Sequence, residues 1–254
     1  MKAIIQSMKI GFLMLVLAAF ATAASAQMTA QPSNNQLSIK DMVAQAELVF
    51  AGRVEKIQYA LSEPTGPNGA RIPHTFVTYR VEEVFAGEAH GNLVTLRFIG
   101  GLDPETMHYL STSRTPLMDL GDQDILFVQG NTEKMCPLVS DFKGRLRVIK
   151  GQVYSETGRS ILLDKKGSIK HGPRYRLDEV EKNTIGGRTL TMKKLGPKVK
   201  SLPSDAVGSA TLKELVKKSA KEHKRKKAFV DADPFSVFAG PDLTPAPMPA
   251  VEAQ

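Results

Sequence analysis

The sequence contains no tryptophan, a single cysteine and few aromatic residues, which make up 6% of its 254 positions. Because Cys136 stands alone, the chain cannot form an internal disulfide bond, and its fold must depend on a hydrophobic core. The chain also lacks the HExxH and CxxC spacings of zinc sites and the DxDxDG-type spacing of a calcium loop. We therefore expect neither a disulfide scaffold nor a cofactor.

Long apolar runs are confined to the N-terminus. Lys2 and Lys9 precede the run GFLMLVLAAFATA (residues 11–23), and the small-residue site Ala24-Ser25-Ala26 follows it. This is the layout of a secretory signal peptide, which predicts cleavage between Ala26 and Gln27. The run is short for a membrane span of ~20 residues. We expect an exported protein, periplasmic or extracellular, with no transmembrane segment after cleavage.

Charge divides the remaining chain. Residues 28–142 hold 8 Lys and Arg against 14 Asp and Glu, whereas residues 143–227 hold 24 against 8. The last 27 residues have four acids, no Lys or Arg and several prolines. We predict a flexible spacer over 27–36, a folded domain over 37–170 and an extension over 171–254. The extension is basic and then Pro-rich, which predicts that it is partly helical or largely disordered.

The folded domain is predicted to begin with a short helix that runs directly into a strand. Ser38 and Asp41 have the spacing of a helix-capping box, and apolar residues follow at helical spacing to Ala46. The segment LVFAGRVEKIQY (48–59) is rich in β-branched and aromatic residues and predicts a strand, with a bulge or bend at Gly52.

Further strands follow at short intervals. In HTFVTYRVEEVFAG (74–87), Val77, Tyr79 and Val81 alternate with polar residues and predict the inward face of a strand. Three more segments have strand character: NLVTLRFIGG (92–101), DILFVQG (124–130) and GRLRVIKGQVY (144–154). The last of these is predicted to contain a hairpin turn at Lys150-Gly151. The segment SILLDKKGSI (160–169) predicts another hairpin, with its turn at Lys166-Gly167. Six or seven short strands predict a mainly β domain, either a small antiparallel OB-like barrel or a sandwich.

Two helices are expected in the extension. The segment RYRLDEVEK (174–182) predicts one short helix, and residues 211–229 predict another, with Thr211 as the N-cap.

The order of these features over residues 41–165 resembles a group of exported bacterial proteins with a domain like that of the tissue inhibitors of metalloproteinases. The matching segments are DMVAQAELVFAGRV, TFVTYRVEEVFAG, LVTLRFIGG, GDQDILFV and GRLRVIKGQVY. The resemblance covers about half of the chain and implies a netrin-type OB fold. Animal inhibitors of this fold chelate the protease zinc through an N-terminal cysteine, but the expected first residue here is Gln27, so that mechanism does not carry over.

Histidines and acids are the first candidates for chemistry. His74, His90, His108 and His171 lie in separate segments without metal-ligand spacing, and we expect them to be solvated surface residues. A group of acids in and beside the loop at 102–124 could serve hydrolysis or bind Ca²⁺, but we favour exposed loop acids, with Asp122 and Asp124 flanking a turn that enters a strand. These acids are Asp103, Glu105, Asp119, Asp122 and Asp124.

Cys136 has two readings. It could be a nucleophile if a base and a positive environment lay beside it. It could equally be a small buried apolar side chain, which is how free cysteines commonly pack, and we favour this reading.

The basic run near the C-terminus is a candidate for attraction to anionic membrane surfaces or lipopolysaccharide. A solvated, solubilising segment is the alternative, and both readings stay open. Export and the lack of interleaved aromatic residues argue against nucleic acid. The candidate residues are Lys217, Lys218, Lys221, Lys224, Arg225, Lys226 and Lys227.

These observations predict a non-enzymatic binding module with no catalytic or metal residues. It would recognise a protein or cell-envelope component through the loops at 60–73 and 100–120, because binding residues concentrate on loops held by rigid strands. Two alternatives remain: an inhibitor of an exported metalloprotease, and an enzyme that uses Cys136.

Overall fold

The computed structural model describes residues 37–64, 69–112, 115–175, 180–185, 188–193, 204–223 and 227–235. The chain divides into two units, residues 1–35 and residues 36–254, and every described residue belongs to the second. The predicted signal peptide, its cleavage site at Ala26 and Gln27, and nearly all of the spacer lie outside the described residues.

The described unit begins with helix α2 (Ile39–Gln45). The Ser38 hydroxyl accepts a hydrogen bond from the Asp41 N–H at 3.1 Å, and the Asp41 carboxylate accepts one from the Ser38 N–H at 3.3 Å. This reciprocal pair is the predicted capping box, and it satisfies N–H groups that have no partner within the helix. Ile39, Met42 and Val43 are buried, so the helix packs by its apolar face.

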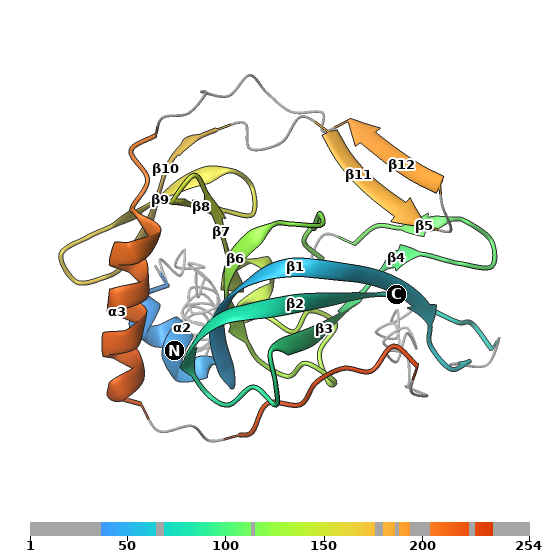
Figure 1. The fold of residues 1–254 in the computed structure, drawn as a ribbon, viewed down its shortest axis with the longest axis horizontal. Helices are drawn as coiled ribbons and strands as arrows, with labels where there is room; N and C mark the ends of the chain where they lie inside the picture. The colour runs from blue at the N-terminus through green and yellow to red at the C-terminus, as the bar shows by residue number, and fades with distance from the viewer. Residues whose placement is uncertain are drawn as a thin grey trace, which may run out of the picture. The chain divides into compact units, whose positions relative to one another are not determined.

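An antiparallel sheet of eight strands dominates the fold, in the order β10-β9-β8-β7-β6-β1-β2-β3 (Figure 1). The mainly β prediction is confirmed. Two small pairs, β4–β5 and β11–β12, stand beside this sheet. The strand bounds are β1 (Leu48–Leu61), β2 (Pro73–Ala86), β3 (Leu93–Ile99), β4 (Gly101–Leu102), β5 (Tyr109–Leu110), β6 (Gln123–Val128), β7 (Arg145–Ile149), β8 (Gln152–Ser155), β9 (Arg159–Leu163), β10 (Ile169–Arg174), β11 (Val180–Ile185) and β12 (Arg188–Lys193).

Two local predictions are confirmed in the strand pairing. The register between β1 and β2 shifts between Ala51 and Gly52, as the glycine indicated. A Cβ at Gly52 would come within 2.8 Å of the Arg80 carbonyl oxygen, so the close approach of the strands requires glycine. Lys150 and Gly151 both have positive φ angles, 51° and 78°, in the turn that joins β7 to β8. Positive φ at both positions characterises a tight hairpin turn that fits the strand twist.

The strands of the predicted OB-like barrel do not close into a barrel. The sheet is open, because its edge strands β3 and β10 do not pair with each other in the described structure. The outer edge of β3 is taken instead by irregular segments: the Ile99 N–H donates to the Met135 carbonyl oxygen at 2.8 Å, and the Arg97 N–H donates to Asn131 at 3.0 Å. Loop residues thus accept hydrogen bonds from the backbone N–H groups of β3 that a further strand would need for pairing.

Both faces of the central strands are buried in separate apolar clusters. Alternation along β1 directs Val49 to a helix-side core and Phe50 to a second core on the other face, as expected for a strand covered on both sides. The helix-side core comprises Ile39, Met42, Val43, Ala46, Val49, Ala51, Ala86, Ile125, Phe127, Val139, Leu146, Val153, Ile161, Ile169, Leu212 and Val216. The second core comprises Leu48, Phe50, Val54, Val77, Tyr79, Val94, Leu96, Phe98, Met118, Leu126, Val128, Cys136, Leu138 and Phe229.

The packing does not end at residue 170, where the domain boundary was predicted. Helix α3 (Ser209–Lys221) lies beside α2 and inserts Leu212 and Val216, both fully buried, into the helix-side core (Figure 1). Phe229 is only 2% exposed and belongs to the second core. Because these apolar side chains are buried in the two cores, this part of the expected extension belongs to the folded domain. The Pro-rich end lies outside the described residues.

Details of the predicted extension also differ. The N-cap of α3 is Gly208 rather than Thr211, and the helix ends at Lys221 rather than near residue 229. The segment 174–182 forms no helix in its described part: Arg174 ends β10, the Tyr175 N–H donates to the Gly158 carbonyl oxygen, and β11 begins at Val180. Within the described residues, no helix combines the length and apolar character needed to cross a membrane.

Candidate functional site

The densest group of ionisable side chains surrounds Arg145 on β7. Its Nε donates to Asp124 on β6 at 2.8 Å, and its Nη2 donates to Asp122 at 2.6 Å. Nη1 donates to both Glu156 and the Leu117 carbonyl oxygen, at 2.8 and 2.7 Å. The Arg145 side chain is 0% exposed, so this guanidinium uses four charged or polar acceptors to compensate for complete burial.

Two further side chains complete the cluster. Arg147 donates to the second oxygen of Asp122 at 3.0 Å, and the Tyr79 hydroxyl donates to Asp124 at 3.0 Å. Strand alternation explains the grouping, because Arg145 and Arg147 lie two positions apart and therefore project from the same face of β7. We call these residues the Arg145 cluster: Tyr79, Asp122, Asp124, Arg145, Arg147 and Glu156.

The two aspartates of the Arg145 cluster differ electrostatically. Burial raises the pKa of Asp124, and the attraction of Arg145 does not outweigh it. Burial also acts to raise the pKa of Asp122, but the guanidinium groups of Arg145 and Arg147 outweigh burial and hold that pKa below its usual value. Burial, together with the adjacent Asp124, raises the pKa of Tyr79 well above its usual value.

This arrangement corrects the expectation that Asp122 and Asp124 are simple loop acids. Their carboxylates bind Arg145 inside the protein, and Asp124 is 1% exposed. The same guanidinium reaches Leu117, and Glu156 accepts a hydrogen bond from the Leu117 N–H at 3.2 Å. The cluster therefore fixes the loop before β6 onto β7 and the β8–β9 turn.

His74 is also not the surface residue that was expected. It is 3% exposed, and its Nδ1 donates to the Ile72 carbonyl oxygen at 2.9 Å. Burial lowers the pKa of His74 to about 4, and the positive charge of Arg97 acts in the same direction. His74 is thus a neutral buried side chain at neutral pH. The other three candidate histidines, His90, His108 and His171, are exposed, as predicted.

Cys136 is 3% exposed and packs in the second core. This position agrees with the interpretation of Cys136 as a small, buried apolar side chain. Among the described residues, no group of three or more His, Cys, Asp or Glu side chains is arranged to hold a metal ion.

The basic candidates divide into two kinds. Lys217 lies 2.8 Å from Glu83 on β2 and 3.0 Å from Glu214, and Lys227 lies 3.7 Å from Glu47 and also pairs with Glu133. These two lysines thus pair with acids of β2 and of the segments before β1 and after β6. Lys218 and Lys221 are exposed and form no ion pair with another described residue, whereas Lys224, Arg225 and Lys226 lie outside the described residues.

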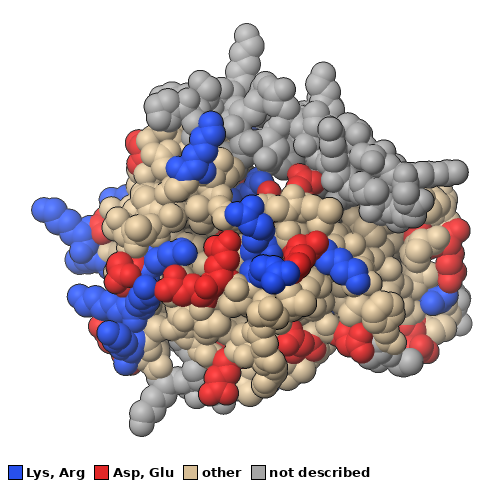
Figure 2. Space-filling view, viewed as in Figure 1, with Lys and Arg blue, Asp and Glu red and all other residues tan. Residues whose placement is uncertain are grey.

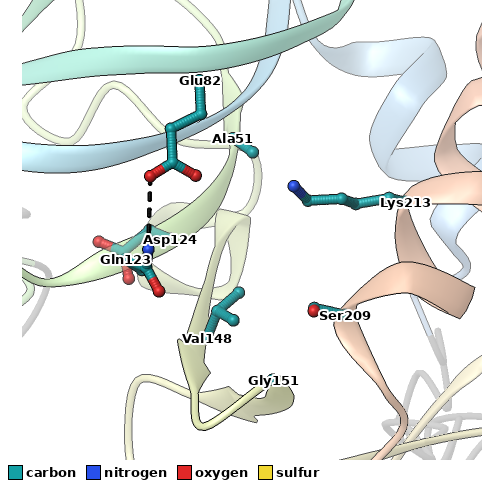
Figure 3. Close-up of a pocket in the computed structure, with 8 residues that line it drawn as sticks. All are labelled: Ala51, Glu82, Gln123, Asp124, Val148, Gly151, Ser209 and Lys213. Carbon is teal, nitrogen blue, oxygen red and sulfur yellow. Dashed lines mark hydrogen bonds between the residues drawn. The ribbon is translucent and has the colours of Figure 1, made fainter.

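A small pocket lies between the first turns of α3 and the sheet (Figure 3). Lys213 and Ser209 extend from α3 toward the sheet, where Gln123 donates to Glu82 at 3.3 Å. The volume of about 240 Å³ is below the ~300–1,000 Å³ of typical ligand pockets. Asp124 lines the pocket, and one of its carboxylate oxygens accepts hydrogen bonds from Arg145 and Tyr79, so the pocket borders the Arg145 cluster.

Comparison with known proteins gives no match: no family model, no curated protein and no solved structure is significantly similar to the chain. The site must therefore be interpreted from its own geometry.

Sequence reasoning missed the central residue, Arg145. One signal was present: in GRLRVIKGQVY, Arg145 and Arg147 occupy alternate positions of a predicted strand, and Leu146 and Val148 occupy the others. Two arginines on one face of a strand next to acids on its neighbour indicate an ion-pair cluster, once the pairing of the strands is known.

Proposed function

We propose that the protein is an exported, non-enzymatic binding module that recognises a protein or cell-envelope component through the loops at 60–73 and 100–120. The lysine-rich C-terminal part adds attraction to anionic surfaces. A relationship to the exported proteins with a domain like that of the tissue inhibitors of metalloproteinases is part of this proposal. The helix that leads directly into a long, bent strand supports that relationship.

The observation that carries the proposal is the linkage between the two loops. Arg71, from the first loop, donates to Glu105 in the second at 2.6 Å and to the Ser62 carbonyl oxygen at 3.3 Å. Beneath them, the Thr75 hydroxyl on β2 donates to the Gly100 carbonyl oxygen at 2.7 Å. The loops thus lie side by side on a rigid strand end, and rigid presentation lowers the entropic cost of binding a partner.

The second loop also presents apolar side chains to solvent. Leu120 is 60% exposed, Met107 46% and Leu110, on β5, 40%. Exposed side chains of this kind give a binding surface its apolar contacts. By contrast, the buried acids and histidine of the same region are engaged in contacts that hold the fold.

Affinity capture from the native cell envelope tests the proposal. A tagged chain that starts at Gln27 should retain a defined partner, and Leu120→Asp combined with Met107→Asp should weaken the purified complex at least tenfold. The matched control is Leu93→Asp, because Leu93 is 42% exposed at the opposite end of β3. Equal loss with both variants, or no retained partner, would contradict loop recognition.

The same capture distinguishes the alternatives. A metalloprotease as the retained partner would make the protein an inhibitor that acts through a loop. An activity lost in Cys136→Ser with the fold intact would make it a Cys-dependent enzyme.

A further inference from the structure

Three structural elements meet at one end of the helix-side core and bring exposed lysines together. The Ile39 N–H at the start of α2 donates to the Gly167 carbonyl oxygen in the β9–β10 turn at 3.2 Å. Gly167 also faces α3, because a Cβ built on it would lie 3.4 Å from Leu215. Lys40 of α2 completes the contact by pairing with Glu222, just after α3, at 3.1 Å.

The lysines at this junction are exposed. Lys165 and Lys166 occupy the β9–β10 turn, and Lys218 and Lys221 lie on the part of α3 that faces solvent. None of these four forms an ion pair with another described residue. Hydrogen bonding and attraction by Lys40 lower the pKa of Glu222, and Lys218 lowers it further, so both lysines lie near this carboxylate. Figure 2 shows Lys and Arg side chains gathered at the left of the molecule, where Figure 1 places α3.

We propose that these lysines form a docking face for an anionic lipid bilayer. The face is defined by the four exposed lysines Lys165, Lys166, Lys218 and Lys221. The inference rests on the proposed function, since it specifies where an exported module attaches to the envelope, but it does not depend on loop recognition of a partner.

A bilayer fits the chemistry of this face better than a single phosphate group. The cations come from two separate elements, the β9–β10 turn and α3, and all are lysines, which act as mobile point charges rather than as rigid forks for one phosphate. Lysines spread in this way each add to the attraction of an anionic surface. Two of the candidate residues of the basic run are left out of this face. Lys217 pairs with Glu83, and Lys227 pairs with Glu47 and Glu133.

Vesicle sedimentation tests the face. The probes are vesicles of phosphatidylglycerol mixed with phosphatidylcholine, and vesicles of phosphatidylcholine alone; the protein is the chain from Gln27 onward. The face variant carries Lys165→Gln, Lys166→Gln, Lys218→Gln and Lys221→Gln. The control carries Lys56→Gln, Lys134→Gln, Lys143→Gln and Lys150→Gln, which remove the same charge from exposed positions elsewhere.

We expect the unmodified protein to bind only the anionic vesicles, and high salt to weaken this binding. Partitioning should be at least tenfold lower for the face variant and should change less than threefold for the control. Inorganic phosphate at equal ionic strength should not compete better than chloride, which separates a bilayer from a phosphate site. Equal losses of vesicle binding in both variants would show that binding depends only on the net charge of the protein, and would overturn the inference. So would intact binding by the face variant together with loss in Lys224→Gln, Arg225→Gln and Lys226→Gln. Neither result would bear on envelope capture by the loops.

Discussion

At the scale of single residues, the ionisable groups that the sequence offered as chemistry serve the fold. Asp122 and Asp124 show this most clearly, because both bind Arg145, a residue that the sequence did not single out and whose side chain joins two strands, a loop and a turn. Moving an ion pair from water into a protein costs several kcal/mol per ion, and good geometry is needed to recover that cost. The cost of losing one partner is therefore much larger than the net stabilisation from the cluster.

Arg145→Leu should lower the free energy of unfolding by about 3–5 kcal/mol, because it leaves the buried Asp124 and the nearly buried Asp122 without their main counter-charge. The measurement is urea unfolding at pH 7, followed by circular dichroism. Arg80→Ala is the control: Arg80 pairs with Glu55 at the surface, with 55% and 38% of the side chains exposed, and should cost less than about 1 kcal/mol. Similar losses in the two variants would show that Arg145 does not anchor the loop.

At the scale of the elements, much could be predicted from the sequence. The capping box at Ser38, the bulge at Gly52 and the turn at Lys150-Gly151 depend on local chemistry, and each is present. Side-chain alternation also located the inward face of β2, where Val77 and Tyr79 are buried. Such features can be read from short segments because few residues determine them.

Features that depend on contacts distant in sequence could not be predicted in the same way. The sequence predicts a helix within 211–229 but places it in a basic, flexible extension, because an apolar stripe does not reveal what it packs against; in the structure Leu212 and Val216 of α3 are core residues. His74 resembles a loop residue in the sequence, but its burial is set by the Ile72 contact and by the surrounding strand ends. The prediction of an OB-like barrel did not anticipate the open sheet for a similar reason. Nothing in β3 itself reveals that residues 131–135 and 231–232 occupy its edge.

The edge of β3 leads to a prediction at this scale. The Thr95 N–H donates to Asp231 at 2.9 Å, and the Ala232 N–H donates to the Thr95 carbonyl oxygen at 3.1 Å. Deleting residues 227–254 should expose these groups and the site of Phe229, and an exposed sheet edge promotes association. We expect the average mass to rise with concentration in analytical ultracentrifugation, relative to the full chain.

The control for this deletion removes only residues 236–254, which lie beyond the described contacts, and should behave as the full chain. If the longer deletion fails to fold, Asp231→Ala provides a milder test, because it should speed hydrogen exchange at the Thr95 amide without unfolding the sheet. Unchanged mass in the deletion and unchanged exchange in the variant would contradict a protective role for residues 231–232.

At the scale of the whole molecule, two cores share one sheet, and segments beyond residue 170 complete both: α3, from the basic region, completes the helix-side core, and Phe229, just after that region, completes the second core. Charge within the described unit is therefore not divided as it is in the sequence. Lys213 and Lys217 of α3 lie against Glu83 of β2, so basic and acidic halves of the chain meet in the folded protein. These ion pairs offset part of the charge of each half, and the stability of the domain also depends on the ionisation of buried groups.

The pH dependence of stability follows from His74. Its pKa is about 4 in the folded protein and about 6.5 when exposed, so the unfolded chain binds an additional proton between these values. Stability from this residue is complete above pH 6.5 and falls as the pH drops toward 4. Between pH 7 and pH 4.5, His74→Gln should therefore lose roughly 2 kcal/mol less unfolding free energy than the unmodified chain, by urea titration. His90→Gln, an exposed control, should keep the original slope. Equal slopes for His74→Gln and the unmodified chain would mean that the pKa of His74 is the same in the folded and the unfolded chain, and would contradict the effect of its burial.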